Sequence, residues 1–196
     1  MHQGTATTLQ ILLSLCVGVG LSAACGLRVF VPLLTAGLAG HFGIIHLNDS
    51  FAWMGTFPAL IAFTVATVVE VAAFHIPWID HFLHLIAAPV ALVAGTLLMA
   101  SVITGLPPFL HWALALIAGG GAAGIFQFLS MGTRGVSTVT TAGLANPALG
   151  TAESAGSVAL SVLAILLPVV AAVAVLGISM YALTRVARFF RSSPAK

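Results

Sequence analysis

Long apolar stretches, separated by short polar or proline-containing segments, run through the whole chain. Five of them reach about the 20 residues that an α-helix needs to cross a bilayer: 7–25, 53–74, 81–104, 108–131 and 155–183. Pro168 predicts a kink inside the last stretch, because proline removes a backbone hydrogen bond. The pattern therefore predicts an all-α integral membrane protein with about five transmembrane helices.

Two further stretches are poorly suited to a straight crossing. Residues 27–45 are apolar but contain Arg28, Pro32 and two glycines, whereas residues 135–150 are short and rich in threonine. Irregular backbone at membrane depth is tolerated where it is buried in protein or lines a cavity. We expect both stretches to be broken or re-entrant segments.

One motif occurs in each half of the chain with identical spacing. A Gly-x-Arg triplet ending at Arg28 precedes Thr-Ala-Gly-Leu-Ala from Thr35, and a triplet ending at Arg134 precedes the same five residues from Thr141. If both following segments re-enter, an odd number of crossings separates the copies, and the two halves lie inverted in the membrane. Inverted repeats are a recurrent design of transporters. The alternative, in which both segments span, makes the repeat parallel.

The repeat sets the predicted domain organisation. We expect a single membrane domain over residues 1–196, with repeat one at about 7–76, a connecting helix at about 81–104 and repeat two at about 108–183. A basic tail follows at 184–196. Basic segments next to membrane helices favour the cytoplasmic side, so we expect the C-terminus there.

Composition supports the membrane assignment and excludes other classes. The chain is 60% hydrophobic and 5% charged, whereas soluble domains carry about 25% charged residues. Its formal net charge is +2, and the basic cluster is too short to indicate nucleic-acid binding. Cys16 and Cys25 both fall in the first apolar stretch, which argues against a structural disulfide. Residues 1–10 lack Lys and Arg, so we expect a retained first helix rather than a cleaved signal peptide.

Arg28 and Arg134 are the leading candidates for function, because an arginine buried in a bilayer is costly and needs a role or a partner. Guanidinium presents a rigid fork of donors that suits phosphate or carboxylate. The first hypothesis is a small transporter or lipid-translocating protein for an anionic or amphiphilic substrate. Its further substrate contacts would be Thr35, Thr141, Glu70 and Asn146.

The alternative hypothesis gives these charges a structural role. Each arginine would reach an interface or pair with Glu70, Asp80 or Glu153 in a non-transporting membrane scaffold or assembly protein. Glu70 is the carboxylate inside a predicted spanning helix, and it could relay protons or serve as a permanent partner of an arginine. A chain this small offers little room for a complete path, so we expect a homo-oligomer in contact with the lipid bilayer.

A third hypothesis rests on the histidines around Pro77. His81 and His84 are spaced i, i+3 beside Asp80, with His75 one turn away, and such residues could bind a metal or haem iron. No matching Cys or second His pair stands at a characteristic spacing, so we predict no cofactor. The chain also lacks a phosphate-binding loop, a Ser-His-Asp arrangement and a zinc-protease motif. We therefore expect no enzyme activity.

The same region carries a family resemblance. The run Ile-Pro-Trp-Ile-Asp-His at 76–81, with Glu70 before it and Pro89 after it, resembles the central signature of domain-of-unknown-function family 4126. Further matches, short but spread over nearly the whole chain, are Ala24, Gly26-Leu27, Pro32-Leu33-Leu34, Gly132-Thr133-Arg134 and Asn146-Pro147. The resemblance implies a multi-pass protein of the bacterial cytoplasmic (inner) membrane and brings no established activity.

The chain also departs from that family's pattern. His75 stands in place of a lysine, Phe74 in place of an aspartate and Ala88 in place of an arginine, and an acidic pair early in the last helix is missing. These departures weaken any role of the turn in ion chemistry.

Overall fold

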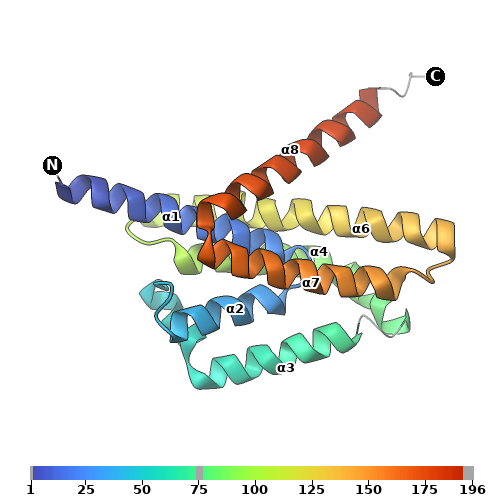
Figure 1. Ribbon diagram of the computed structural model, residues 1–196, viewed down its shortest axis with the longest axis horizontal. Coiled ribbons are helices and arrows are strands. Elements are labelled where there is room, and N and C mark those ends of the chain that lie inside the picture. The colour runs from blue at the N-terminus through green and yellow to red at the C-terminus, as the bar shows by residue number, and fades with distance from the viewer. Residues whose placement is uncertain (1, 74–76, 192–196) are drawn as a thin grey trace.

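The computed structural model describes the backbone of residues 2–73 and 77–191 and the side chains of residues 8–73, 86–185 and 188. Within these ranges the chain is helical and contains no strand, which confirms the all-α prediction (Figure 1). The helices are α1 (His2–Cys25), α2 (Phe30–His41), the 3₁₀ helix η1 (Asp49–Gly55), α3 (Phe57–Ala73), α4 (Pro77–Val102), α5 (Pro108–Leu114), the π-helix η2 (Ala115–Gly120), α6 (Gly121–Thr141), α7 (Asn146–Leu166) and α8 (Pro168–Arg191).

The number of candidate crossings agrees with the predicted number. Four helical stretches among the described residues are long and apolar enough to cross a membrane: Thr8–Cys25, Pro108–Thr141, Asn146–Leu166 and Pro168–Arg185. A fifth arises if η1 and α3, which meet at an angle of 65°, are taken as one bent span. These lengths and compositions are those of a membrane protein.

Helix α1 is the central element, and the chain reverses at its end. Leu21, Ala23, Ala24 and Cys25 are fully buried, and α1 packs against α2, α4, α6, α7 and α8. After residues 26–29, α2 runs in roughly the opposite direction to α1 (Figure 1). Its 12 residues extend about 18 Å, too short for a hydrocarbon core of about 30 Å. The predicted broken segment after Arg28 is therefore confirmed.

The close packing of this turn against α6 requires a glycine. A Cβ on Gly26 would collide with the backbone carbonyl of Ala123, and it would lie 2.6 Å from Cβ of Phe126 and 2.8 Å from the amide nitrogen of Gln127, all on α6. The end of α1 thus touches the backbone of α6, as small residues permit in membrane bundles.

The fourth predicted helix, 108–131, is longer than predicted. Helices α5, η2 and α6 form one continuous stretch from Pro108 to Thr141. Its π-helical part lies where a Cβ on Gly119 would come within 2.6 Å of the carbonyl oxygen of Gly95 on α4. Arg134 consequently lies inside a helix and not at the start of a new segment.

The prediction of a re-entrant segment at 135–150 is wrong. Residues 135–141 complete α6, a turn with Ala142 and Gly143 at positive φ follows, and α7 begins at Asn146. The threonines that suggested irregular structure are accommodated in the helix, because their hydroxyls find acceptors in the carbonyls four residues earlier. Thr138 bonds to Arg134 and Thr141 to Ser137 in this way.

Other boundaries also differ from the predictions. The stretch 155–183 is two helices, because Leu167 leaves the helical region (φ −133°, ψ 68°) before Pro168, as pre-proline sterics favour. Helix α4 begins at Pro77, a favoured first helical position, and not at residue 81. The first part of the predicted tail, through Arg191, belongs to α8, whereas residues 192–196 lie outside the described residues.

The inverted repeat is not confirmed. In the first copy, the Gly-x-Arg triplet forms the turn after α1 and Thr35 starts a run inside α2. In the second copy, the triplet lies inside α6 and the residues from Thr141 form the turn. The two copies share sequence without sharing local structure.

Candidate functional site

Arg28 sits in the buried turn between α1 and α2 and points towards α7. Its side chain is 1% exposed. The Nε atom donates to Oγ of Ser154 at 2.9 Å, and Nη2 donates to the carbonyl oxygen of Gly150 at 2.7 Å. The same Nη2 lies 3.5 Å from Oε2 of Glu153. The turn that ends α1 is thereby fixed to the first half of α7.

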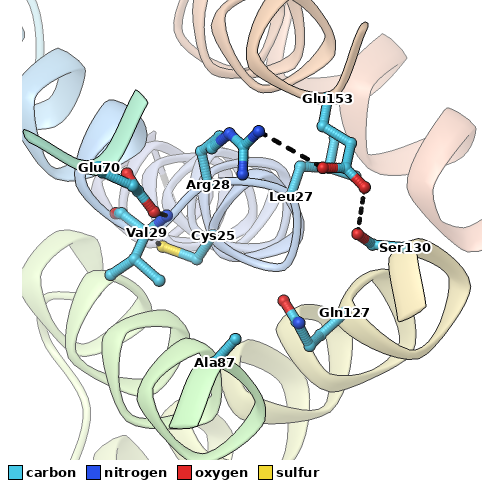
Figure 2. A pocket seen from close by; sticks show the side chains of 9 residues that line it. All are labelled: Cys25, Leu27, Arg28, Val29, Glu70, Ala87, Gln127, Ser130 and Glu153. Atoms are coloured by element: carbon cyan, nitrogen blue, oxygen red, sulfur yellow. Dashed lines mark hydrogen bonds and ion pairs between the residues drawn. The ribbon is translucent and has the colours of Figure 1, made fainter. Parts of the chain in front are cut away.

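Arg134 reaches the same carboxylate from α6. Its Nε donates to Oε1 of Glu153 at 3.1 Å, and its Nη2 pairs with Oε2. Ser130, one turn earlier on α6, donates its hydroxyl to Oε1. Both interior arginines therefore form ion pairs with one buried carboxylate. Figure 2 shows the contacts of this carboxylate with Arg28 and Ser130. We call Arg28, Arg134, Glu153 and Glu70 the charge centre.

Glu70 occupies the opposite side of the turn. From α3, its Oε1 accepts a hydrogen bond from the backbone N–H of Val29 at 2.7 Å (Figure 2). Its Oε2 accepts one from the backbone N–H of Phe30 at 3.0 Å. These two N–H groups belong to the start of α2, where helical amides lack intrahelical partners and the macrodipole is positive. A carboxylate at this position accepts the hydrogen bonds of these two N–H groups, and its negative charge lies favourably at the positive end of the helix dipole.

A small cavity lies between these groups. It has a volume of about 20 Å³ and is lined by both carboxylates, Arg28, Gln127 and Ser130, with Cys25, Leu27, Val29 and Ala87. That volume holds about one water molecule. The charge centre is thus closed to larger ligands in this conformation.

A row of polar side chains connects the cavity with the turn between α6 and α7. Gln127, Ser130, Arg134, Ser137 and Thr141 recur at helical spacing on α6, and all but Thr141 are buried. We call this row the polar face of α6. At its outer end, Nδ2 of Asn146 donates to Oγ1 of Thr138 at 3.5 Å, and the buried Oδ1 of Asn146 has no hydrogen-bond partner among the described residues.

The structure brings together only part of the predicted site. Arg28, Arg134 and Glu70 lie at the charge centre. Thr35, Thr141 and Asn146 do not line its cavity. Thr35 lies within α2, with its hydroxyl bonded to the carbonyl of Val31. Thr141 and Asn146 flank the α6–α7 turn.

Sequence reasoning missed the central role of Glu153 and its neighbours. Glu153 entered only as one of three possible arginine partners, and Gln127 and Ser130 did not enter. A detectable signal existed, because Gln127, Ser130 and Arg134 follow i, i+3, i+7 spacing in an otherwise apolar helix. Such a polar face in a spanning helix needs a partner.

The residues of the histidine hypothesis lie largely outside the part of the chain that the structure describes. His75 lies outside the described residues, as do the side chains of Asp80, His81 and His84. In the part of the chain whose side chains are described, no group of three His, Cys, Asp or Glu residues could hold a metal ion.

Comparison with known proteins gives one match. The family model described as "Domain of unknown function (DUF4126)" matches residues 15–188. No curated protein and no solved structure matches the chain.

Proposed function

This chain belongs to the DUF4126 family, and from this premise we propose that it is a small transporter. It would move an anionic group across the bacterial cytoplasmic membrane. The observation that carries the proposal is the charge centre. Two arginines and the N-terminus of a short helix converge inside an apolar helical bundle. Helix breaks whose positive ends face a buried site recur where transporters bind anionic groups.

Carboxylates of the chain itself occupy both anion-binding elements. Glu153 takes the arginines, and Glu70 takes the start of α2. We infer that a substrate carboxylate or phosphate replaces Glu153 between Arg28 and Arg134. Because an unpaired charge is costly in the interior, Glu153 must then accept a proton or move to water. This exchange would couple anion movement to protons.

The polar face of α6 provides the route. It leads from the cavity to Thr141 and Asn146, and these two of the three predicted residues that lie away from the centre would be outer contacts of the path. Buried Ser137 stands between Arg134 and this outer end. An anion entering there would meet hydroxyl and amide donors before it reached the guanidinium groups.

The experiment is transport by the purified protein in liposomes. A free anion (radiolabelled phosphate or a dicarboxylate) forms one arm, and a phospholipid with a fluorescent headgroup forms the other, so the arms distinguish a solute from a lipid headgroup. The double variant Arg134→Gln/Glu153→Gln removes one charge of each sign and keeps hydrogen-bonding groups. We expect it to fold and to lose transport. Arg185→Ala, outside the charge centre, is the matched control and should transport like wild type.

A second function has specific support in the closed cavity of about 20 Å³. A scaffold or assembly protein would use the charge centre to hold α1, α3, α6 and α7 together. It predicts that wild-type liposomes show no flux above protein-free liposomes in either arm, whereas Arg28→Ala and Arg134→Ala lower the melting temperature in detergent. Flux that the double variant abolishes would exclude this second function.

Two parts of the proposal concern the setting. The basic end of α8 and the tail would face the cytoplasm, as the excess of arginine there favours. A homo-oligomer would supply the room that one small chain lacks. Crosslinking in native membranes, followed by mass determination, tests the oligomer.

A further inference from the structure

We propose that this protein holds a phospholipid molecule in a site separate from the charge centre. The site, which we call the lipid pocket, consists of two hollows that share Ile44 in the connection between α2 and η1. One hollow carries polar groups, and the other is almost entirely apolar.

The first hollow, of about 450 Å³, lies between α1, the connection and the end of α4. Its polar side chains are Gln10, His46 and Thr104, with Ser14, whose hydroxyl already donates to the carbonyl of Ile11 at 2.8 Å. Gln10 and His46 are exposed, whereas Val17, two turns further along α1, is buried. This hollow is therefore polar at its outer side and apolar where it approaches the bundle.

The second hollow, of about 200 Å³, is a groove between α2 and α7. Leu38, Ala39, Val162 and Leu166 line it together with Ile44. Thr35 also lines this groove, and its hydroxyl already donates to the carbonyl of Val31. Nothing on these walls calls for a polar ligand, so the groove suits a hydrocarbon chain.

The wall between the hollows is held in place. The backbone N–H of Asn48 donates to the carbonyl of Ser101 at 2.7 Å, and its side-chain Nδ2 donates to the carbonyl of Ile103 at 3.2 Å. Both acceptors belong to the end of α4. These bonds anchor the connection that carries Ile44 and His46.

The chemistry of the two hollows matches one kind of molecule. Amide, hydroxyl and imidazole groups can donate to phosphodiester oxygens, and the groove can take one acyl chain. The groove is also continuous with an apolar surface, because Val162 is 41% and Leu166 67% exposed on a helix suited to span the membrane. A phospholipid can therefore enter sideways from the bilayer, with its headgroup by His46 and one chain passing Ile44.

The test is photo-crosslinking in nanodiscs with a phosphatidylethanolamine that carries a diazirine on one acyl chain. We expect labelled peptides to concentrate at residues 35–44 and 162–166. Leu38→Trp, at a half-exposed position, should fill the groove and remove most of this labelling, and Thr35→Trp should do the same. Val173→Trp, on an exposed part of α8, is the matched control and should leave the labelling unchanged.

The headgroup is tested by competition. His46→Ala/Thr104→Val should weaken competition by unlabelled phosphatidylethanolamine while competition by diacylglycerol stays unchanged. Labelling spread evenly over α8 and α7, or equal labelling in Leu38→Trp and Val173→Trp, would overturn the lipid pocket. Because Arg134→Gln/Glu153→Gln leaves both hollows intact, its labelling should match wild type whether or not the protein transports anions.

Discussion

At the scale of single residues, Glu153 is the side chain on which the interior charges depend. It accepts hydrogen bonds from Arg134 and Ser130 and forms an ion pair with Arg28, and these partners come from two other segments of the chain. A buried ion pair contributes little net stability against an apolar replacement, but the loss of one partner is costly. The centre is therefore sensitive to any change that removes one charge alone.

The first prediction concerns that sensitivity. Glu153→Ala takes away the carboxylate that two buried guanidinium groups share, and it should cost about 3–5 kcal/mol of stability. Thermal unfolding in detergent measures the effect as a lowered melting temperature. Asp49→Ala, which removes an exposed carboxylate from η1, should change the melting temperature little. Equal melting temperatures for the two variants would contradict the shared carboxylate.

A second prediction at this scale contrasts two glycines. Gly26→Ala places a methyl group against backbone atoms of α6 that cannot turn aside, so it should destabilise by about 1–3 kcal/mol. Gly132→Ala, inside α6 with open space around the new Cβ, should be neutral or stabilising by up to about 1 kcal/mol, because alanine favours the helix. Melting temperatures that shift the same way in both variants would show that the close approach at Gly26 is not real.

At the scale of elements, the start of α2 is the feature that sets the site apart from an ordinary bundle. A short helix that begins inside the molecule has first N–H groups without intrahelical partners, and Glu70 from α3 satisfies two of them. The pairing ties α2 to α3 and holds Arg28, directly before α2, towards α7. The attachment of α2 to α3 thus depends on one carboxylate.

The prediction that follows is that Glu70→Gln loosens α2 selectively. The amide keeps the size of the side chain but loses the negative charge at the helix N-terminus and offers one acceptor where the carboxylate offered two. The local cost should be about 1–2 kcal/mol. Hydrogen exchange followed by mass spectrometry should show faster exchange in a peptide covering 29–41 and unchanged exchange in α7. The control is Thr67→Val, which removes a hydroxyl that bonds within α3. Faster exchange of the 29–41 peptide in this control too would point to general destabilisation.

At the scale of the whole molecule, the helices run between two ends of different character. The α6–α7 turn lies at one end and the connection between α2 and η1 at the other (Figure 1). The polar face of α6 leads to the first end, and the lipid pocket lies near the second. The charge centre lies between them, at the reversal after α1. A transporter in this arrangement must open towards each end in turn.

The prediction for the whole molecule concerns sidedness. In a protein with Cys16 and Cys25 replaced by Ala, single cysteines at Ser50 and Leu144, both exposed, should react with a membrane-impermeant thiol reagent from opposite sides. With the C-terminal tail inside, Ser50→Cys should react in intact cells and Leu144→Cys in inverted vesicles. Reaction of both from one side would refute the orientation of the two ends.

The sequence by itself determined the class of the molecule and the approximate position of most of its apolar helices, although several of their bounds differ. Runs of about 20 apolar residues report directly on crossing a bilayer, because every residue in them contributes to the same transfer free energy. The same local reasoning singled out Arg28, Arg134 and Glu70, since a charge within apolar sequence is visible without any fold. It also located the broken helix after Arg28, where Gly26 and Pro32 interrupt the apolar run.

Only the tertiary structure decided what these charges meet. Whether Arg28 pairs with Glu70 or Glu153 depends on how α3 and α7 pack around the turn, and no local pattern specifies that packing. The same limit explains why the inverted repeat predicted from the sequence is not confirmed, because identical short motifs have different local structures in different surroundings. In α6 the Thr-rich segment is helical, with its hydroxyls bonded to its own backbone, whereas the chain reverses after α1, where Gly26 lies against α6. Local sequence sets what a segment can form, and packing selects among those forms, because burial and hydrogen bonding between distant segments outweigh small local preferences.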